Sequence, residues 1–192
     1  MQLDAPQRGF SYKQNGPLDL RFNPSKGRSA AQLLGAIGEQ ELTALLQCNA
    51  DEHQAPTIAS ALVAAAHPCV TTADLVALIT KTLERVRGAH TPGEIKKTLQ
   101  RCFQALRIAV NDEFGALDRF LCQLPSCLKS GGRAAILSFH SGEDRRVKKA
   151  FQAGLRSGRY SSIAPEPLRP SLPEQHSNPR SACAKLRWAV CR

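Results

Sequence analysis

Residues 130–149 read SGGRAAILSFHSGEDRRVKK, which combines a turn, an apolar run, a polar corner and a basic helix. The apolar run, residues 133–139, predicts a short strand covered on both faces of a parallel sheet. His140 and Ser141 follow at its carboxyl end, the edge at which open α/β sheets bind ligands. An ordinary connection from strand to helix, with a structural histidine, accounts for the same pattern. The stretch therefore predicts an α/β fold with a candidate site at this corner.

Helical patterns occupy the segment before this strand. Residues 29–87 predict short amphipathic helices that pack into a small bundle, because helices of this length need tertiary contacts to be stable. Two of these helices begin at capping boxes, Ser29 with Gln32 and Thr71 with Asp74. After a loop at 88–93, apolar residues recur with helical spacing through residues 94–124, which predicts one long helix.

Loop-forming residues dominate two further segments, residues 1–27 and 160–180. A long irregular opening needs a scaffold on which to lie, so we expect the chain to begin within a domain. Residues 185–190 alternate polar and apolar side chains, which predicts a terminal antiparallel strand.

Basic side chains are concentrated in the last third of the chain. The formal net charge is +10, and residues 129–192 carry thirteen basic and four acidic side chains. Such an excess favours a polyanionic partner such as a nucleic acid, although single cations more commonly belong to a solvated surface.

The seven cysteines form no CxxC pair and no cluster with histidine at zinc-ligand spacing. They predict buried free thiols in a reducing compartment, without a structural metal. The sequence shows no signal-peptide pattern and no apolar run long enough to span a membrane. We therefore expect a cytoplasmic protein, or a protein of an organelle matrix if a targeting segment is missing.

Four segments of the chain resemble, in order and spacing, the ribosomal RNA small subunit methyltransferase H family, also called MraW. They are MQLDAPQRGFSYKQNGPLDLR, FQALRIAVNDEFGALD, GGRAAILSFHSGEDRRVK and NPRSACAKLR. The resemblance spans nearly the whole chain. It implies an enzyme that transfers a methyl group from S-adenosylmethionine to the exocyclic N4 of a cytosine in small-subunit ribosomal RNA.

The resemblance also implies a domain organisation. The fold would be a partial Rossmann-like class I methyltransferase sheet with an inserted helical bundle domain. Residues 1–27 and 105–192 would belong to the methyltransferase domain, and residues 28–104 would form the inserted domain that recognises the substrate. Half of such a sheet leaves an unpaired strand edge beside residues 133–139, through which the chain would associate, for example as a homodimer.

Most of the family's cofactor site has no counterpart in this sequence. A glycine-rich turn after the first strand and an acidic residue ending the second hold S-adenosylmethionine in such enzymes, and neither is present. Gln2 alone matches a cofactor-contacting residue, and Gly142 stands where the family usually has leucine. We therefore expect weak cofactor binding and a truncated chain. The alternatives are a catalytically inactive RNA-binding remnant and the product of a broken reading frame.

Candidate catalytic residues follow from the chemistry that the resemblance implies. Cytosine N4 is a weak nucleophile, so the enzyme must align it with the methyl group and offer an acceptor for its hydrogens. His140 is the first candidate for this acceptor, and Ser141, Asp19 and Asn111 are further candidates. Asp19 as a turn cap and Asn111 as a hydrogen bond between helix and loop are equally good interpretations.

Nine basic side chains are candidates for binding the RNA phosphates, because guanidinium and ammonium groups suit phosphates. They are Arg21, Arg107, Arg145, Arg146, Lys148, Lys149, Arg180, Lys185 and Arg187. Each of them can equally be an ordinary surface charge. Phe10 and Tyr12 are candidates for stacking on an extruded base, although packing under the loop is the favoured role for Phe10.

Overall fold

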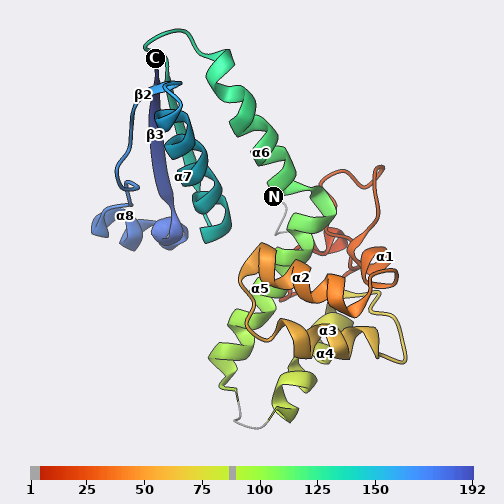
Figure 1. The fold of residues 1–192 in the computed structure, drawn as a ribbon. Helices are drawn as coiled ribbons and strands as arrows, with labels where there is room; N and C mark the ends of the chain where they lie inside the picture. The colour runs from red at the N-terminus through yellow and green to blue at the C-terminus, as the bar shows by residue number, and fades with distance from the viewer. Residues whose placement is uncertain (1–4, 87–89) are drawn as a thin grey trace. The chain divides into compact units, whose positions relative to one another are not determined.

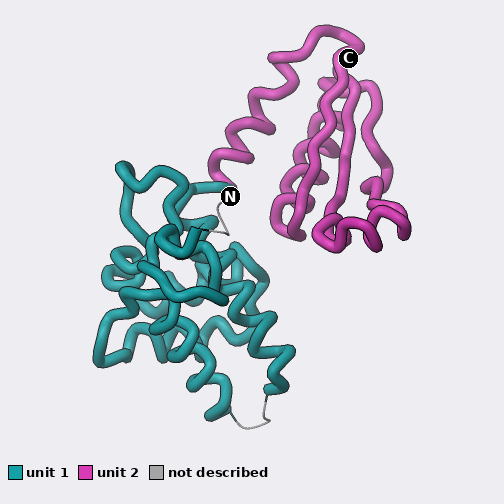
Figure 2. The backbone as a smooth tube through the Cα atoms, turned by 180° about the vertical axis from the view of Figure 1, so that it is seen from behind, with its two compact units in different colours: residues 1–113 teal, residues 114–192 magenta. Residues whose placement is uncertain are grey.

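The computed structural model describes residues 5–86 and 90–192. The chain forms two compact units, residues 1–113 and residues 114–192, which Figure 2 shows in different colours. Gln2, the candidate cofactor contact, lies outside the described residues.

Unit 1 is helical and opens with a long loop that contains one short 3₁₀ helix, η1 (Pro6–Arg8) (Figure 1). Its helices are α1 (Ala30–Leu34), α2 (Glu39–Ala50), α3 (Ala55–Val63), α4 (Thr72–Arg85) and α5 (Pro92–Asn111). The predicted capping boxes at Ser29 and Thr71 are confirmed, and Thr91 forms a third with Glu94. The short helices that the sequence predicts are therefore present.

The opening loop belongs to the core of unit 1. Leu18 and Leu20 are buried together with Leu42, Leu75 and Leu106 of the helices. The compact unit thus continues to residue 113, whereas the predicted domain limits lie after residues 27 and 104. Those limits concern the domains of the family, and they stay a prediction.

The predicted long helix over residues 94–124 is wrong, because the structure breaks it at Asp112. α5 ends at Asn111, and α6 (Glu113–Gln123) begins after Asp112, whose φ is +49°. Aspartate is one of the few residues that adopt this left-handed conformation readily. A helical hydrophobic period continues on both sides of the break and hides it from pattern analysis.

Unit 2 places helices beside a three-stranded sheet. After α6 come η2 (Leu124–Cys127), β1 (Arg133–Ser138), α7 (Ser141–Arg156), β2 (Tyr160–Ile163), α8 (Leu172–Ser177), η3 (Pro179–Cys183) and β3 (Lys185–Cys191). The strand order is β1-β3-β2, and β3 is antiparallel to both neighbours. The predicted antiparallel terminal strand is therefore confirmed, whereas the predicted loop over residues 160–180 is wrong in part, since it contains β2 and α8.

Helix α7 covers one face of this sheet (Figure 1). Val147 and Phe151 of α7 pack with Ala134 of β1 and Ala189 of β3 in the core of unit 2. On the other face, Leu137 is 52% exposed. The predicted strand is present. The predictions that both of its faces are covered and that its neighbours are parallel are wrong for the described residues. An apolar run alone does not specify what packs against it.

The cysteines have no disulfide partners, and Cys48, Cys122, Cys127 and Cys183 are exposed rather than buried. In the described parts of the chain, no helix combines the length and the apolar character needed to cross a membrane. Within the same residues, no three metal-ligating side chains gather closely enough to hold a metal ion.

Candidate functional site

Asp19 and Arg21 form a bidentate ion pair in the opening loop of unit 1. Asp19 Oδ2 lies 2.7 Å from the Arg21 guanidinium, and Oδ1 accepts hydrogen bonds from Arg21 Nε and from the Arg21 backbone N–H. The side-chain hydrogen bond from Arg21 lowers the pKa of Asp19 below its ordinary value. Asp19 is therefore a turn cap, the second of its two interpretations, and Arg21 already has an anionic partner.

Asn111 joins the end of α5 to the same loop. Its Nδ2 donates to the carbonyls of Leu20 and Arg107 at 2.7 and 2.9 Å, and its Oδ1 accepts the Phe22 N–H at 2.7 Å. Leu20 is fully buried and has a φ of +63°, which leucine rarely adopts. Asn111 thus holds a strained turn in place, and the catalytic roles of Asn111 and Asp19 stay predictions.

His140 caps the N-terminus of α7 in unit 2. Its Nδ1 accepts the Glu143 backbone N–H at 3.4 Å, and its Nε2 lies 3.3 Å from Glu143 Oε1. Glu143 Oε2 in turn accepts the Phe139 N–H at 3.0 Å. Burial raises the pKa of Glu143, but the contacts with His140 and Phe139 outweigh it and leave this pKa below its ordinary value. Ser141 is the exposed first residue of α7.

This cap determines which imidazole nitrogen carries the proton. A nitrogen that accepts a hydrogen bond has no proton of its own, so a neutral His140 is protonated at Nε2. Nε2 then carries the proton and lies 3.3 Å from Glu143 Oε1, without the geometry of a hydrogen bond. The predicted role of His140 as an acceptor for amine hydrogens therefore requires the cap hydrogen bond to be released when substrate binds, and it stays a prediction.

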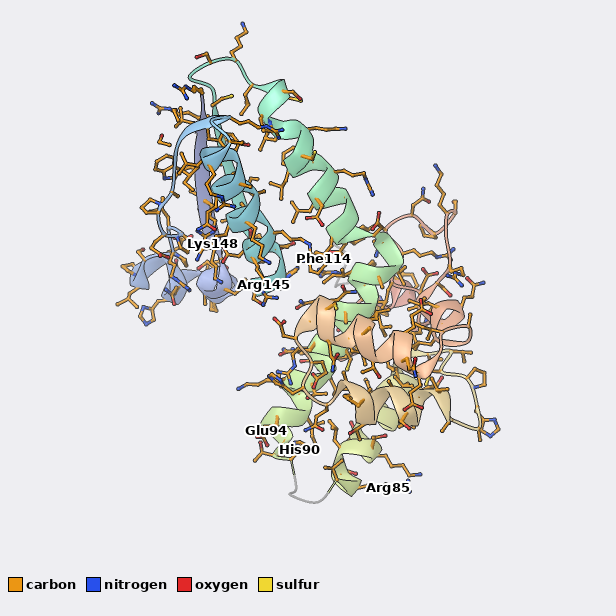
Figure 3. The ribbon with its side chains drawn as sticks, viewed as in Figure 1. Arg85, His90, Glu94, Phe114, Arg145 and Lys148 are labelled. Atoms are coloured by element: carbon orange, nitrogen blue, oxygen red, sulfur yellow. The ribbon has the colours of Figure 1, made fainter. Side chains whose placement is uncertain are left out.

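Phe114, at the start of α6, fills the space above Gly142 (Figure 3 labels Phe114). A Cβ atom built on Gly142 would lie 2.6 Å from Phe114 Cζ. The ring also lies 5.7 Å from the His140 ring and 3.6 Å below the Arg146 guanidinium. The aromatic ring therefore occupies the volume that a larger side chain at position 142 would need.

The variant Gly142→Leu is expected to destabilise unit 2 by about 1 to 3 kcal/mol, because it overpacks the contact with Phe114. Thermal unfolding followed by circular dichroism measures the loss. The double variant with Phe114→Ala frees the volume, and it should be more stable than Gly142→Leu alone. A double variant no more stable than the single one would show that Phe114 does not limit this position.

Asp144, in the first turn of α7, holds two cations of β3. Its Oδ1 lies 2.7 Å from Arg187 Nε, and its Oδ2 lies 3.3 Å from both Arg187 Nη2 and Lys185 Nζ. Burial raises the pKa of Asp144, but the hydrogen bonds from Arg187 and Lys185 outweigh it and lower this pKa. The Arg187 side chain is only 6% exposed. Arg187 thus joins helix to sheet, a role that sequence analysis missed because its partner is 43 residues away.

The other candidate cations differ in how far their side chains are exposed. Arg107 forms a two-pronged pair with Glu113, at 2.7 and 3.0 Å, and Arg146 lies 3.3 Å from Asp118 as well as over Phe114. The remaining candidates are Arg145, Lys148 and Lys149 on the exposed side of α7, where Figure 3 labels the first two, and the exposed Arg180 of η3.

A cleft of about 660 Å³ lies on the open face of the sheet in unit 2. Leu137, Phe139 and Leu186 supply apolar walls, and Arg180 and Asn178 supply polar groups. Phe139, which lines the cleft, precedes His140 in the chain, whereas the His140 ring lies beside Phe114 and is not part of the lining. The volume of the cleft is in the range of small-molecule sites.

The MraW methylase family matches this chain over residues 1–191. Ribosomal RNA small subunit methyltransferase H 2 of Alkaliphilus metalliredigens (strain QYMF) is 51% identical, over 99% of this chain and 55% of the relative. Ribosomal RNA small subunit methyltransferase H 1 of Lachnoclostridium phytofermentans is 48% identical, over 99% of this chain and 53% of the relative. Ribosomal RNA small subunit methyltransferase H of Prochlorococcus marinus (strain MIT 9303) is 43% identical, over 98% of this chain and 59% of the relative.

The chain spans about half the length of these curated relatives. The match nevertheless runs along almost all of its own residues and includes the loop, the α7 corner and β3. On this continuous similarity, the chain belongs to the MraW methylase family.

Proposed function

We propose that this chain is the RNA-facing part of an S-adenosylmethionine-dependent methyltransferase that acts on the N4 of a cytosine in small-subunit ribosomal RNA. The observation that carries the proposal is family membership over residues 1–191. The names of the curated relatives supply the substrate class. The alternative, an RNA-binding remnant without activity, shares the same RNA-binding surface and differs only in methyl transfer.

The strand arrangement of unit 2 supports a Rossmann-like methyltransferase sheet. β1 and β2 are both antiparallel to β3, so they run parallel to each other, and α7 connects them. The outer edge of β1 has no partner strand among the described residues. We propose that the part of the family's length that this chain does not span continues the sheet from that edge.

The described residues do not fit S-adenosylmethionine. The cleft on the open sheet face carries Arg169 and Arg180 against one carboxylate, Glu174, which is an unfavourable setting for a sulfonium cation. The turn before β1 contains Gly131 and Gly132 at the amino end of the strand, whereas cofactor turns follow a strand's carboxyl end. We therefore propose that most of the cofactor site lies in the part of the family that this chain does not span.

This chain would contribute RNA binding and base orientation. The exposed cations of α7 and η3 suit phosphates, and residues 129–192 carry nine more positive than negative charges. We propose that His140, at the carboxyl end of β1, contacts the target base when substrate binds. Arg187, Lys185, Arg107 and Arg21 serve mainly to hold the fold, because each already has an acidic partner.

The variant Lys148→Gln/Lys149→Gln is expected to reduce the salt dependence of RNA binding. Each phosphate contact that is lost should reduce the slope of log K against log salt by about 0.7 for single-stranded RNA, because fewer counterions are released. Glutamine is a comparable helix former, so α7 should be unchanged. Fluorescence anisotropy with a labelled small-subunit ribosomal RNA fragment, over a series of salt concentrations, measures this slope.

A matched control is Lys96→Gln/Lys97→Gln, since these are also adjacent exposed lysines on a long helix, α5. This control should keep the slope of the unmodified chain. Equal slopes for the α7 variant and the unmodified chain would make the α7 lysines an ordinary solvated surface. Arg146 is left in place because its contacts with Asp118 and Phe114 would confuse an effect on RNA with an effect on packing.

A further inference from the structure

The opening loop of unit 1 carries an exposed aromatic ring, Phe22, on a backbone that is held by hydrogen bonds. Phe22 is 43% exposed. Its N–H donates to Asn111 Oδ1 at 2.7 Å, and its carbonyl accepts from the Arg8 guanidinium at 2.8 Å. Asn111, at the end of α5, ties the loop to a helix of unit 1, and Arg8 lies earlier in the same loop. The ring is therefore presented to solvent by a backbone that is hydrogen-bonded on both sides.

The inner face of this ring rests on a second aromatic side chain. The Phe10 and Phe22 rings are stacked, with centroids 5.8 Å apart and an interplanar angle of 18°. Phe10 is only 7% exposed, and the Arg8 guanidinium lies 5.3 Å from its centroid. Tyr12, the other predicted stacking residue, packs edge-on against Phe103. Phe22 is thus the most exposed ring of this loop among the described residues, since Tyr12 is partly buried.

The strained turn beside Phe22 separates two large apolar side chains. Leu20, with its φ of +63°, is fully buried, while Phe22 two residues later points outward. Unusual backbone conformations of this kind persist where the surroundings enforce them, and they often occur at binding sites. Here the Asn111 side chain enforces the turn through its bonds to the Leu20 carbonyl and the Phe22 N–H.

Positive charge predominates in the loop that carries the ring. Residues 5–28 contain five basic side chains and one acidic side chain, and the acidic one, Asp19, is paired with Arg21. Lys13, Lys26 and Arg28 are exposed. An exposed aromatic ring among cations is the combination by which proteins bind single-stranded nucleic acids, with bases stacked on the ring and phosphates beside the cations.

We propose that the Phe22 ring stacks on a nucleobase of single-stranded RNA while the exposed cations of the same loop contact the flanking phosphates. This inference rests on the proposed RNA substrate and adds a base contact in unit 1. Stacking needs no particular base, so it contributes affinity and holds the strand in position, while recognition of the target base is left to other residues.

Phe22→Leu in the full 192-residue chain tests the inference, because leucine keeps an apolar contact with Phe10 but cannot stack on a base. Affinity for a single-stranded oligoribonucleotide of about twelve nucleotides should fall about 5- to 150-fold. Phe22→Tyr should retain the affinity of the unmodified chain. Phe120→Leu is the matched control, since Phe120 on α6 is also exposed, at 50%, and should leave the affinity unchanged.

A reporter variant gives a second measurement. Trp188 is the single tryptophan of the chain, so Phe22→Trp/Trp188→Phe places the only indole at the proposed site. Its emission should be quenched when the oligonucleotide binds. Unchanged affinity of Phe22→Leu, or equal losses for Phe22→Leu and Phe120→Leu, would overturn the stacking inference and leave the proposed function standing. Absence of RNA binding by the unmodified chain would overturn both.

Discussion

Asp144→Asn is expected to destabilise unit 2 by about 3 to 5 kcal/mol, because it leaves the guanidinium of Arg187 buried without its anionic partner. The Asp144 side chain is 11% exposed and that of Arg187 is 6% exposed, so water cannot replace the lost charge. Urea unfolding measures the change. Trp188 follows Arg187 on β3 and is the only tryptophan, so its fluorescence reports on unit 2 alone.

The control for this prediction is Asp118→Asn, which removes the partner of Arg146 at a site where the aspartate side chain is 57% exposed. Exposed pairs contribute about 0 to 1 kcal/mol, so this variant should be close to the unmodified chain. Similar, small losses for both variants would contradict the structural role of the Asp144–Arg187 pair.

The same pair should make unit 2 sensitive to acid. The folded-state pKa of Asp144 lies below its unfolded value, so its charge stabilises the fold above the unfolded pKa, near 3.9. This stabilisation is lost as the pH falls through the lower, folded-state pKa. Asp144→Asn should therefore lose this part of the pH dependence.

His140→Asn is expected to lower methyl transfer about 100- to 10,000-fold while leaving the fold intact, because His140 is proposed to contact the reacting base. Asparagine is a favoured N-cap residue, so it replaces the hydrogen bond to the Glu143 N–H but not the imidazole. The rate is measured in a restored protein, in which this chain replaces the matching part of the Alkaliphilus metalliredigens relative.

RNA affinity provides the control for His140→Asn, because the histidine is proposed to act on the base and not on the phosphates. The variant should bind RNA as the unmodified restored protein does. Full activity of His140→Asn would make His140 a helix cap only, and a loss of thermal stability would show that asparagine fails to replace the cap.

Local signals predicted much of the fold. The Ser29 and Thr71 capping boxes and the alternation in β3 each depend on residues close together in sequence, and all three are confirmed. The break at Asp112 was missed because the hydrophobic period continues across it, although Asn111-Asp112 is a pair that tolerates a left-handed turn. β2 was missed because its four residues are too short for a pattern.

The candidate site was predictable only where a residue's role is local. Asp19 and its partner are two residues apart, and a turn cap there was one of the two interpretations. The role of Asp144 depends on Arg187, 43 residues away, and that of Phe22 depends on Asn111, 89 residues away. Such pairs arise from the tertiary fold, so the basic residues chosen from composition included several that the fold uses internally.

Transfer of a labelled methyl group from S-adenosylmethionine to small-subunit ribosomal RNA by the restored protein tests the central claim most directly. Digestion of the RNA and mass spectrometry identify the methylated nucleoside. The account predicts a cytidine methylated at its exocyclic N4. Methylation of another atom, or no methylation under conditions in which the intact Alkaliphilus metalliredigens relative methylates the same RNA, would contradict it.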